Sequence, residues 1–216
     1  MADNYLENKF DELSGRGKGR VVYKKIGQPL ESLLRRNRSY RGYRKDYTVT
    51  REMLEKIVQV NPLLPSARNQ QALRFRLVTQ GDEAERVLAN IRLGGALPEL
   101  HLPFAGSEPS SFIVICSCVE ENRMVDIDLG IAAQSMLLKA VEMGLNGIII
   151  CAFNKENLRC ELSLPYDPLA VIAVGKGNEQ IECVPVSAGD SHAYYRRNGV
   201  HYVPKVRWEE LIITAP

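Results

Sequence analysis

The chain lacks an uninterrupted apolar stretch long enough to cross a membrane. Its longest apolar segment, residues 127–145, contains Asp128, Lys139 and Glu142, whose charges would be costly in the centre of a bilayer. The N-terminus opens on polar and acidic residues with no short apolar region behind them, so it does not resemble a secretory signal. Residues 127–145 therefore predict a buried helix, and we expect the protein to be cytoplasmic.

Paired cysteines and clustered histidines are lacking as well. The five cysteines are an odd number and none has C-x-x-C spacing, which disfavours both a disulfide framework and a zinc site. His101, His192 and His201 are scattered along the chain, so we expect each to be a surface or loop residue rather than a ligand or a base. We expect reduced thiols and no bound metal.

The signatures of several enzyme classes are absent from the sequence. It has no G-x-S-x-G nucleophile elbow, no P-loop, no H-E-x-x-H motif and no G-x-G-x-x-G after an expected strand. Serine hydrolases, P-loop nucleotide hydrolases and metallopeptidases are thereby disfavoured. What the chain has is an ordinary globular composition, 45% apolar and 25% charged over 216 residues, which a single hydrophobic core can serve.

Positive charge is concentrated near the N-terminus, although the net charge of the chain is only +2. Residues 15–51 contain twelve Lys or Arg but only two acids, Glu31 and Asp46. A phosphate-bearing cofactor, a nucleic acid and a solvated surface are three explanations for such a stretch. Motifs elsewhere in the chain decide among them.

Apolar periodicity and capping residues predict helices and strands that alternate through most of the chain. Thr50 and Asn154 are the expected N-caps of two helices, and Asp82 with Glu85 forms a capping box for a third. Residues 112–119 are apolar without alternation, which is typical of a strand covered on both faces. The expected helices are 6–13, 29–36, 51–61, 82–93, 127–144 and one after Asn154, and the expected strands are 74–79, 112–119, 147–153, 170–175 and 210–214.

From Lys176 the periodicity is lost for about forty residues before the last expected strand. A loop of this length is unusual within a compact domain. It contains Tyr194, Tyr195, Tyr202 and Trp208, which argue against disorder. We expect this segment to lie along another surface, such as that of a second subunit.

Four segments resemble the FMN-dependent nitroreductase family in their order and spacing. They are R-S-Y-R at 38–41, P-S-A-R-N-Q-Q at 65–71, the glycine-flanked stretch 144–153 and Y-V-P-K-V-R at 202–207. The resemblance implies an α+β sandwich, in which helices cover a central mixed sheet, with an extended C-terminal arm. It also implies an N-terminal helical and basic extension over 1–32 and an FMN-binding domain over 33–216.

The basic residues at the two ends of the resemblance suit a phosphate. The phosphate of FMN carries nearly two negative charges and favours several cationic donors, including a planar guanidinium. By resemblance, Arg38 with Ser39 and the late pair Lys205 and Arg207 hold the phosphate, while Arg41 lies nearer the pyrimidine edge of the ring. Asn37 stands where many family members have a further basic residue.

The P-S-x-x-N loop is implied to lie along the flavin. Pro65, Ser66 and Asn69 match the positions that offer hydrogen bonds to its ring and ribityl chain. A helix-terminating turn would also use proline and asparagine, for backbone reasons alone. Ala72 and Leu73 replace the usual Pro-Trp that follows this loop, which removes rigidity and aromatic cover.

The stretch near residue 150 is implied to pass the reactive edge of the flavin. Ile150, Cys151 and Ala152 match positions whose backbone N–H groups approach flavin N5, and a plain core strand is the alternative. Family members often have an acidic residue and glycine where this chain has Cys151 and Ala152. Asn90, Arg92 and His101 are open alternatives for a contact with the flavin pyrimidine.

The activity implied by the resemblance needs no side-chain nucleophile. Hydride passes from NADH or NADPH through flavin N5 to a small organic acceptor such as a nitro compound, a quinone or an enone. The resemblance also implies a homodimer with FMN at its interface. We expect neither a membrane nor a nucleic acid as partner.

Two alternatives remain open. A specialised flavin reductase or dehalogenase of the same fold, or a relative that binds FMN without turnover, would share every motif quoted above. A nucleic-acid-binding module would instead use the basic residues of 15–20 and 35–45, which are interleaved with Tyr40 and Tyr43.

Overall fold

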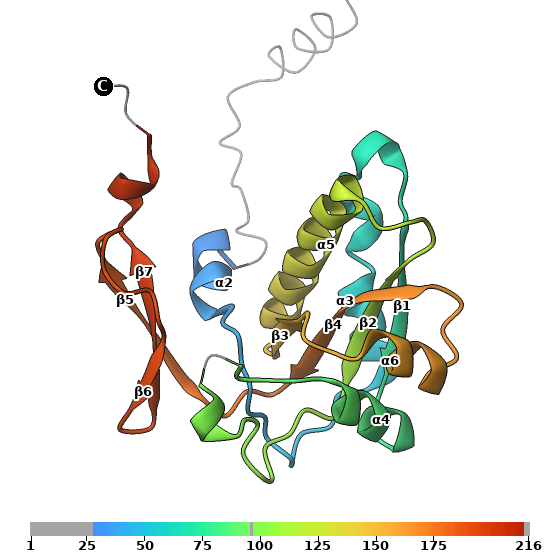
Figure 1. Ribbon diagram of the computed structural model, residues 1–216, viewed down its shortest axis with the longest axis horizontal. Coiled ribbons are helices and arrows are strands. Elements are labelled where there is room, and N and C mark those ends of the chain that lie inside the picture. Colours follow the sequence, from blue (N-terminus) through green and yellow to red (C-terminus); the bar gives the residue numbers. More distant parts are fainter. Residues whose placement is uncertain (1–27, 96, 214–216) are drawn as a thin grey trace, which may run out of the picture.

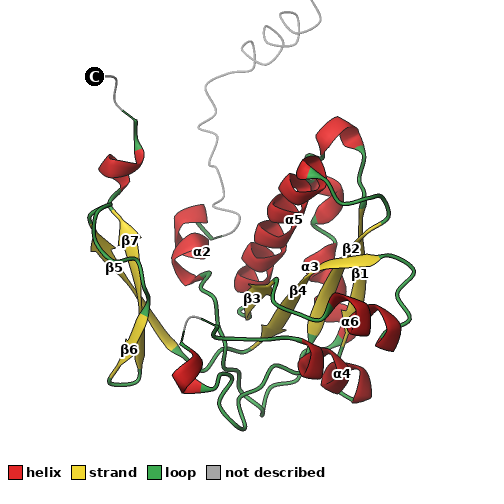
Figure 2. Cartoon of the chain, viewed as in Figure 1, coloured by secondary structure: helices red, strands yellow, loops and turns green. Residues whose placement is uncertain are grey.

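The computed structural model describes residues 28–95 and 97–213 and contains two sheets (Figures 1 and 2). The expected helix 6–13 and the basic residues 15–20 lie outside the described residues. The helices are α2 (Leu30–Arg36), α3 (Arg51–Val58), α4 (Asp82–Asn90), α5 (Arg123–Glu142) and α6 (Lys155–Glu161), and the strands of the central sheet are β1 (Leu73–Val78), β2 (Phe112–Ser117), β3 (Asn146–Ile150) and β4 (Asp167–Gly175).

The central sheet has the strand order β1-β2-β4-β3 and a hydrophobic core on each face. Every residue of β2 is buried, as the apolar run 112–119 predicts for a strand covered on both faces. On one face Ile113 and Ile115 pack with Met136 of α5, and on the other Phe112 and Val114 pack with the helices α4 and α6. The predicted α+β sandwich is therefore observed.

All three ladders of the central sheet are antiparallel. The mixed character that the sequence predicts is limited to one parallel bridge, between Ser39 and Gly147 at the β3 edge. The backbone N–H of Tyr40 donates to the carbonyl of Gly147 at 3.2 Å. This bridge places the segment after α2 directly beside β3.

Two of the three predicted helix caps are observed. The side chain of Thr50 accepts a hydrogen bond from the backbone N–H of Met53 at 3.3 Å, and that of Asn154 accepts from Asn157 at 3.1 Å. The capping box at 82–85 is wrong, because Gly81 occupies the N-cap position with a φ of 123°.

The predicted end of α4 at residue 93 is also wrong. The helix ends at Asn90, and Ile91 adopts an extended conformation that forms an antiparallel bridge with Phe153. Pairing with the segment after β3 thus replaces the last turn that the periodicity predicts.

The long loop predicted after residue 176 is wrong as well. It contains β5 (Gln180–Val186), β6 (Tyr195–Arg197) and β7 (Val200–Val206), which form a second sheet in the order β5-β7-β6. The last expected strand, 210–214, is a 3-10 turn over Trp208–Leu211 within the described residues. In Figure 1 the second sheet stands on the far side of α2 from α5, as an arm beside the main body.

A tight turn and two prolines shape this arm. Asn198 and Gly199, with φ values of 51° and 79°, join β6 to β7 in the left-handed conformations that a two-residue hairpin requires. Pro185 lies on β5 and Pro204 on β7, in a parallel ladder where Val184 pairs with Pro204. Asn-Gly is a strong hairpin signal, but the two prolines weaken the strand pattern around it.

Gly147 tests how tightly the β3 edge is packed. An added Cβ would lie 2.6 Å from the carbonyl oxygen of Ala173 and 2.6 Å from Cδ2 of Leu137. We expect Gly147→Ala to lower the free energy of unfolding by about 1–3 kcal/mol, measured by urea denaturation. Gly130→Ala is the control, because a Cβ on this exposed helical residue meets nothing within 4 Å. Gly130→Ala should be stabilising by about 0.5–1 kcal/mol, and equal effects in the two variants would contradict this packing.

Candidate functional site

A cavity of about 260 Å³ opens between the segment that follows α2 and the second sheet. We call it the cationic cavity, because three basic side chains and none of the acidic residues that the structure describes line it. It brings together four of the residues predicted to hold FMN, from both ends of the chain. Its lining residues are Asn37, Arg38, Ser39, Arg41, Ile181, Tyr194, His201, Val203 and Lys205.

Glu179 joins the two walls of the cationic cavity. Its carboxylate accepts hydrogen bonds from the backbone N–H groups of Arg41 and of Gly42, the latter at 3.0 Å, and it pairs with Arg196 on β6. The side chains of Glu179 and Arg196 are only 7% and 15% exposed. Glu179 thus neutralises Arg196 and leaves the charges of the cavity-lining residues uncompensated. Sequence reasoning missed this residue, which no local motif distinguishes.

His201 lies in the wall of the cationic cavity beside Arg41. It is 1% exposed, so the expectation of a surface or loop histidine is wrong. Alternation along β7 turns His201, Val203 and Lys205 toward the same side. Burial, reinforced by the charges of Arg41 and Arg196, lowers the pKa of His201 to about 4. The imidazole is therefore neutral at pH 7.

An aromatic side chain completes this wall. The Arg41 guanidinium lies 5.0 Å from the ring centroid of Tyr194, within the range of a cation–π contact. The rings of Tyr194 and His201 have centroids 5.1 Å apart. Arg41 is only 9% exposed and its Nη1 lies 3.1 Å from the carbonyl oxygen of Ser39. These contacts fix the direction of the guanidinium.

Three buried donors around the cationic cavity have no hydrogen-bond partner among the described residues. They are Nε of Arg38, Nε of Arg41 and Nδ1 of His201. The other nitrogens of Arg38 donate to the carbonyl of Leu34 at 2.6 Å and to Sγ of Cys183 at 3.0 Å. A buried donor without an acceptor costs about 1–3 kcal/mol. A ligand with several acceptor oxygens would remove this cost, so the donor set fits an anion.

Arg207 lies outside the cationic cavity. β7 ends at Val206, and Nη1 of Arg207 donates to Oγ of Ser187 at 3.0 Å. The structure therefore brings Lys205 to the predicted arginine segment but not Arg207.

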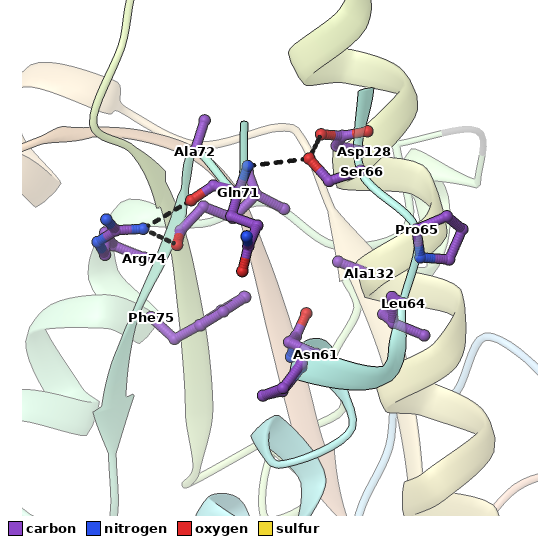
Figure 3. A pocket seen from close by; sticks show the side chains of 12 residues that line it. Asn61, Leu64, Pro65, Ser66, Gln71, Ala72, Arg74, Phe75, Asp128 and Ala132 are labelled. Carbon is purple, nitrogen blue, oxygen red and sulfur yellow. Dashed lines mark hydrogen bonds between the residues drawn. The ribbon is translucent and has the colours of Figure 1, made fainter. Parts of the chain in front are cut away.

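The P-S-x-x-N loop lines a second cavity, of about 160 Å³ (Figure 3). The Ser66 hydroxyl donates to Oδ2 of Asp128 on α5 at 2.6 Å, and the backbone N–H of Gln71 donates to Ser66 Oγ at 2.9 Å. Pro65 lines the same cavity, whereas the exposed Asn69 accepts from Nε2 of Gln71 at 3.0 Å. The structure thus places Pro65 and Ser66 together and Asn69 beside them, outside the cavity.

Asp128 holds this loop in an unusual conformation. Its carboxylate is buried and also accepts from the backbone N–H of Ala67 at 3.0 Å. Arg68, Asn69 and Gln71 have φ values of 53°, 54° and 46°, in the left-handed region that non-glycine residues seldom adopt. The sequence analysis assigns Asp128 no role in the site, and the one signal that could have found it is an acid inside the apolar segment 127–145.

A third cavity, of about 580 Å³, lies where β3 ends. Ile150 is buried, but the exposed Cys151 and Ala152 line this cavity together with Asn90 and Arg92. The backbone N–H of Arg92 donates to the carbonyl of Ala152 at 2.8 Å. Two of the three alternatives for a pyrimidine contact therefore lie beside the predicted backbone segment.

The remaining alternative, His101, lines an adjoining cavity with Arg92 and Leu93. These four cavities have no lining residue in common, apart from Ile91 and Arg92, which the last two share.

The loop 65–71 and the cationic cavity contact different parts of α5. Asp128, which anchors the loop, is near the N-terminus of this helix. The cavity-lining Asn37 donates from Nδ2 to Oε1 of Gln134, near the middle of the helix, at 3.3 Å, and Ser39 bridges Gly147 beyond the C-terminal end. The two sets of predicted residues therefore line separate cavities.

Many other basic residues of the N-terminal segment are paired with acids. Arg35 pairs with Glu31 at 2.6 Å, and Arg44 with Asp46 at 2.6 Å. Lys45 pairs with Glu108 at 2.8 Å, and this contact, with backbone hydrogen bonds, lowers the pKa of Glu108 to about 2. These pairs reduce the charge that the segment would offer to a nucleic acid.

Among residues 28–95 and 97–213, none of the helices is long and apolar enough to span a bilayer. The same ranges contain no group of three or more His, Cys, Asp or Glu side chains arranged to hold a metal ion.

Comparison with known proteins identifies the fold. Residues 105–176 match the model of the nitroreductase family, which covers β2, α5, β3, α6 and β4 but neither wall of the cationic cavity. No curated protein matches the chain by sequence. The resemblance to the nitroreductase family is confirmed, and the chain has the nitroreductase fold.

Several solved structures share this fold. An FMN-dependent nitroreductase from Clostridium difficile R20291 is 26% identical, with 70% of this chain and 89% of that chain covered and a TM-score of 0.58. A nitroreductase family protein from Clostridium difficile 630 is 24% identical, with 70% and 86% covered and a TM-score of 0.56. A mutant of an FMN and NADPH-dependent nitroreductase from Sphigopyxis sp. strain HMH is 18% identical, with 70% and 89% covered and a TM-score of 0.60.

The structural role of Glu179 is open to a direct test. Glu179→Ala leaves Arg196 and two backbone N–H groups without an acceptor, so we expect the free energy of unfolding to fall by about 3 kcal/mol. Glu83→Ala is the control, because it removes an ion pair with Arg76 whose side chains are 41% and 45% exposed. The control should cost less than about 1 kcal/mol. Equal losses in urea denaturation would show that Glu179 does not join the two walls.

Proposed function

We propose that this protein is an FMN-dependent oxidoreductase that transfers hydride from NADH or NADPH to a small organic acceptor, such as a nitro compound, a quinone or an enone. The observation that carries the proposal is the convergence of Arg38, Ser39, Arg41 and Lys205 on one cavity. The fold supports it, since solved structures of the same fold are named as FMN-dependent and as NADPH-dependent nitroreductases.

The residues of the cationic cavity fit the phosphate of FMN. A phosphate monoester brings about two negative charges and three acceptor oxygens, which suit the uncompensated cations and the unpartnered Nε atoms of Arg38 and Arg41. Lys205 would add a point charge and Ser39 a hydroxyl. Arg207 lies outside the cavity, where its hydrogen bond to Ser187 would hold the end of β7 and thereby position Lys205.

The spacing of residues along β3 supports a site in which the chain that binds the phosphate also contacts the flavin ring. The Ser39–Gly147 bridge marks where the phosphate-binding segment meets β3, and Cys151 follows four residues later. A strand rises about 3.3 Å per residue, so these points are roughly 13 Å apart. This separation is of the order of a ribityl chain with its ring. Backbone N–H groups of Ile150, Cys151 and Ala152 would then face the N5 edge.

Bound FMN would supply the redox chemistry, by accepting and donating hydride at N5. The chain would orient the ring and stabilise it. Arg41 lines the same cavity as Arg38 and Lys205, so its charge would act at the phosphate end of FMN rather than at the pyrimidine edge, and Arg92 or Asn90 would approach the ring.

A homodimer would complete the site. Pro65 and Ser66 line a cavity separate from the cationic cavity of their own chain, so we expect a second copy to bring them, together with Asn69, to the flavin. The arm also carries apolar side chains that suit an interface: Trp208 is 67% exposed and Leu211 68%. A second subunit would cover this surface.

A comparison of FMN with riboflavin, which lacks the phosphate, tests the proposed binding site. We expect the purified protein to be yellow and to bleach when NADH or NADPH is added without oxygen. Lys205→Ala should weaken FMN binding at least tenfold and leave riboflavin binding unchanged, because riboflavin has no phosphate. Arg207→Ala should weaken FMN binding less, since its guanidinium lies outside the cavity. A colourless protein that neither FMN nor riboflavin reconstitutes would refute the proposed function.

The dimer is tested by mass. Light scattering should give about twice the chain mass of 24.2 kDa. Trp208→Glu with Leu211→Glu should shift the protein toward monomer and lower its FMN content, because charge replaces the apolar contact. Tyr166→Glu, at an exposed residue just before β4 in the main body, is the control and should remain dimeric. A wild-type monomer with full FMN content would rule the shared site out.

A further inference from the structure

His201 is a buried histidine in the cationic cavity that none of the four family-like motifs includes. It comes from β7, four residues before Lys205, and lies between Arg41 and Tyr194. Its two ring nitrogens have different surroundings. Nε2 lies 3.5 Å from Nη1 of Arg41, and Nδ1 has no partner among the described residues.

The contact with Arg41 favours one position of the imidazole proton. Nε2 lies 3.5 Å from Nη1 of Arg41, and because a guanidinium nitrogen can only donate, Nε2 is the acceptor in this contact. Burial and two neighbouring cations keep the ring neutral, which leaves it a single proton. With Nε2 as the acceptor, that proton is on Nδ1, which makes Nδ1 a donor.

The Nδ1–H group shares its situation with two other donors of the cavity. Nε of Arg38 and Nε of Arg41 are also buried and without partners in the described part of the chain. Three unpartnered donors from two segments of the chain, around one cavity, suit a ligand with several acceptor oxygens. A phosphate monoester offers three such oxygens in a tetrahedral arrangement, together with about two negative charges that match the cations of the cavity.

We propose that His201 is a phosphate-binding residue, neutral and protonated on Nδ1, which donates from Nδ1 to the cofactor phosphate while its Nε2 holds Arg41 in position. The proposal rests on the proposed FMN site and adds to it a ligand that is uncharged. An uncharged donor adds a directional hydrogen bond to the phosphate without adding to the repulsion among the three cations of the cavity. His201 would thus select for the phosphate rather than for negative charge in general.

Two amide substitutions of His201 test the roles of its two ring nitrogens separately. The side-chain nitrogen of His201→Asn lies near the position of Nδ1, so this variant keeps the donor to the phosphate. His201→Gln instead reaches the position of Nε2, where its oxygen can accept from Arg41. We expect FMN binding to weaken roughly ten- to a hundredfold in His201→Gln, which lacks the donor, and less than about threefold in His201→Asn.

Riboflavin provides the internal control for both variants. Its affinity should be the same in the wild type and in each variant, because His201 contacts only the phosphate. Thermal unfolding of each variant without ligand shows that the fold is intact. FMN affinity that is equally weak in both variants, or riboflavin affinity that falls in parallel with FMN affinity, would overturn the proposal.

Nitrogen NMR of protein labelled with ¹⁵N-histidine gives a readout that a merely structural role would not change. The resonance of His201, assigned by its loss in His201→Asn, should show a protonated Nδ1 and an unprotonated Nε2 at pH 7. Addition of FMN or inorganic phosphate should shift the Nδ1 signal, and riboflavin should not. A proton on Nε2, or an Nδ1 signal that phosphate and FMN leave unchanged, would refute the assignment.

The same experiments distinguish failure of the inference from failure of the proposed function. If FMN binds and the flavin is reduced by NADH or NADPH, but the His201 variants behave alike, the inference alone fails. If neither flavin binds, the proposed function fails, and the phosphate titration still decides whether His201 binds a phosphate group.

Discussion

The carboxylate of Glu179 is the constraint on which the candidate site depends. Two backbone N–H groups of the arginine segment and the guanidinium of Arg196 on the second sheet meet at this one side chain. Without it the arm would have no charged attachment to the segment that follows α2. The position of Lys205, and with it the shape of the cationic cavity, is a consequence of this attachment.

The predicted site residues are distributed over separate parts of the fold. The bridge between Ser39 and Gly147 puts the cationic cavity at one end of β3, while Asp128 holds the loop 65–71 near the start of α5. The proposed homodimer would bring these parts together, since the cavities that they line share no residue.

Local signals in the sequence identified most of the main body. The uninterrupted apolar run of β2 and the caps Thr50 and Asn154 depend on neighbours within a few residues, and the structure contains them. The resemblance implies an extended C-terminal arm, but its strands do not follow from the sequence pattern, because Pro185 and Pro204 interrupt it on either side of the Asn198–Gly199 turn.

The site was predictable where its residues belong to motifs, and not where they depend on tertiary contacts. Arg38 and Lys205 are far apart in sequence, yet each belongs to a recognisable motif. Glu179, His201 and Asp128 have no such motif, because burial and partners give each its role. The low pKa of His201 depends on Arg41 and Arg196, which no spacing along the chain reveals.

The two prolines of the arm also limit how copies of the chain can assemble. Pro185 is on β5, which is at the edge of the sheet, and Pro204 lies past the last residue of β7 that β6 pairs with, Tyr202. At both places an incoming strand would find no backbone N–H to pair with. The remaining edge is β6, which is only three residues long and includes two arginines, Arg196 and Arg197. A short, charged edge strand and two prolines together disfavour growth of the arm into a continuous fibre.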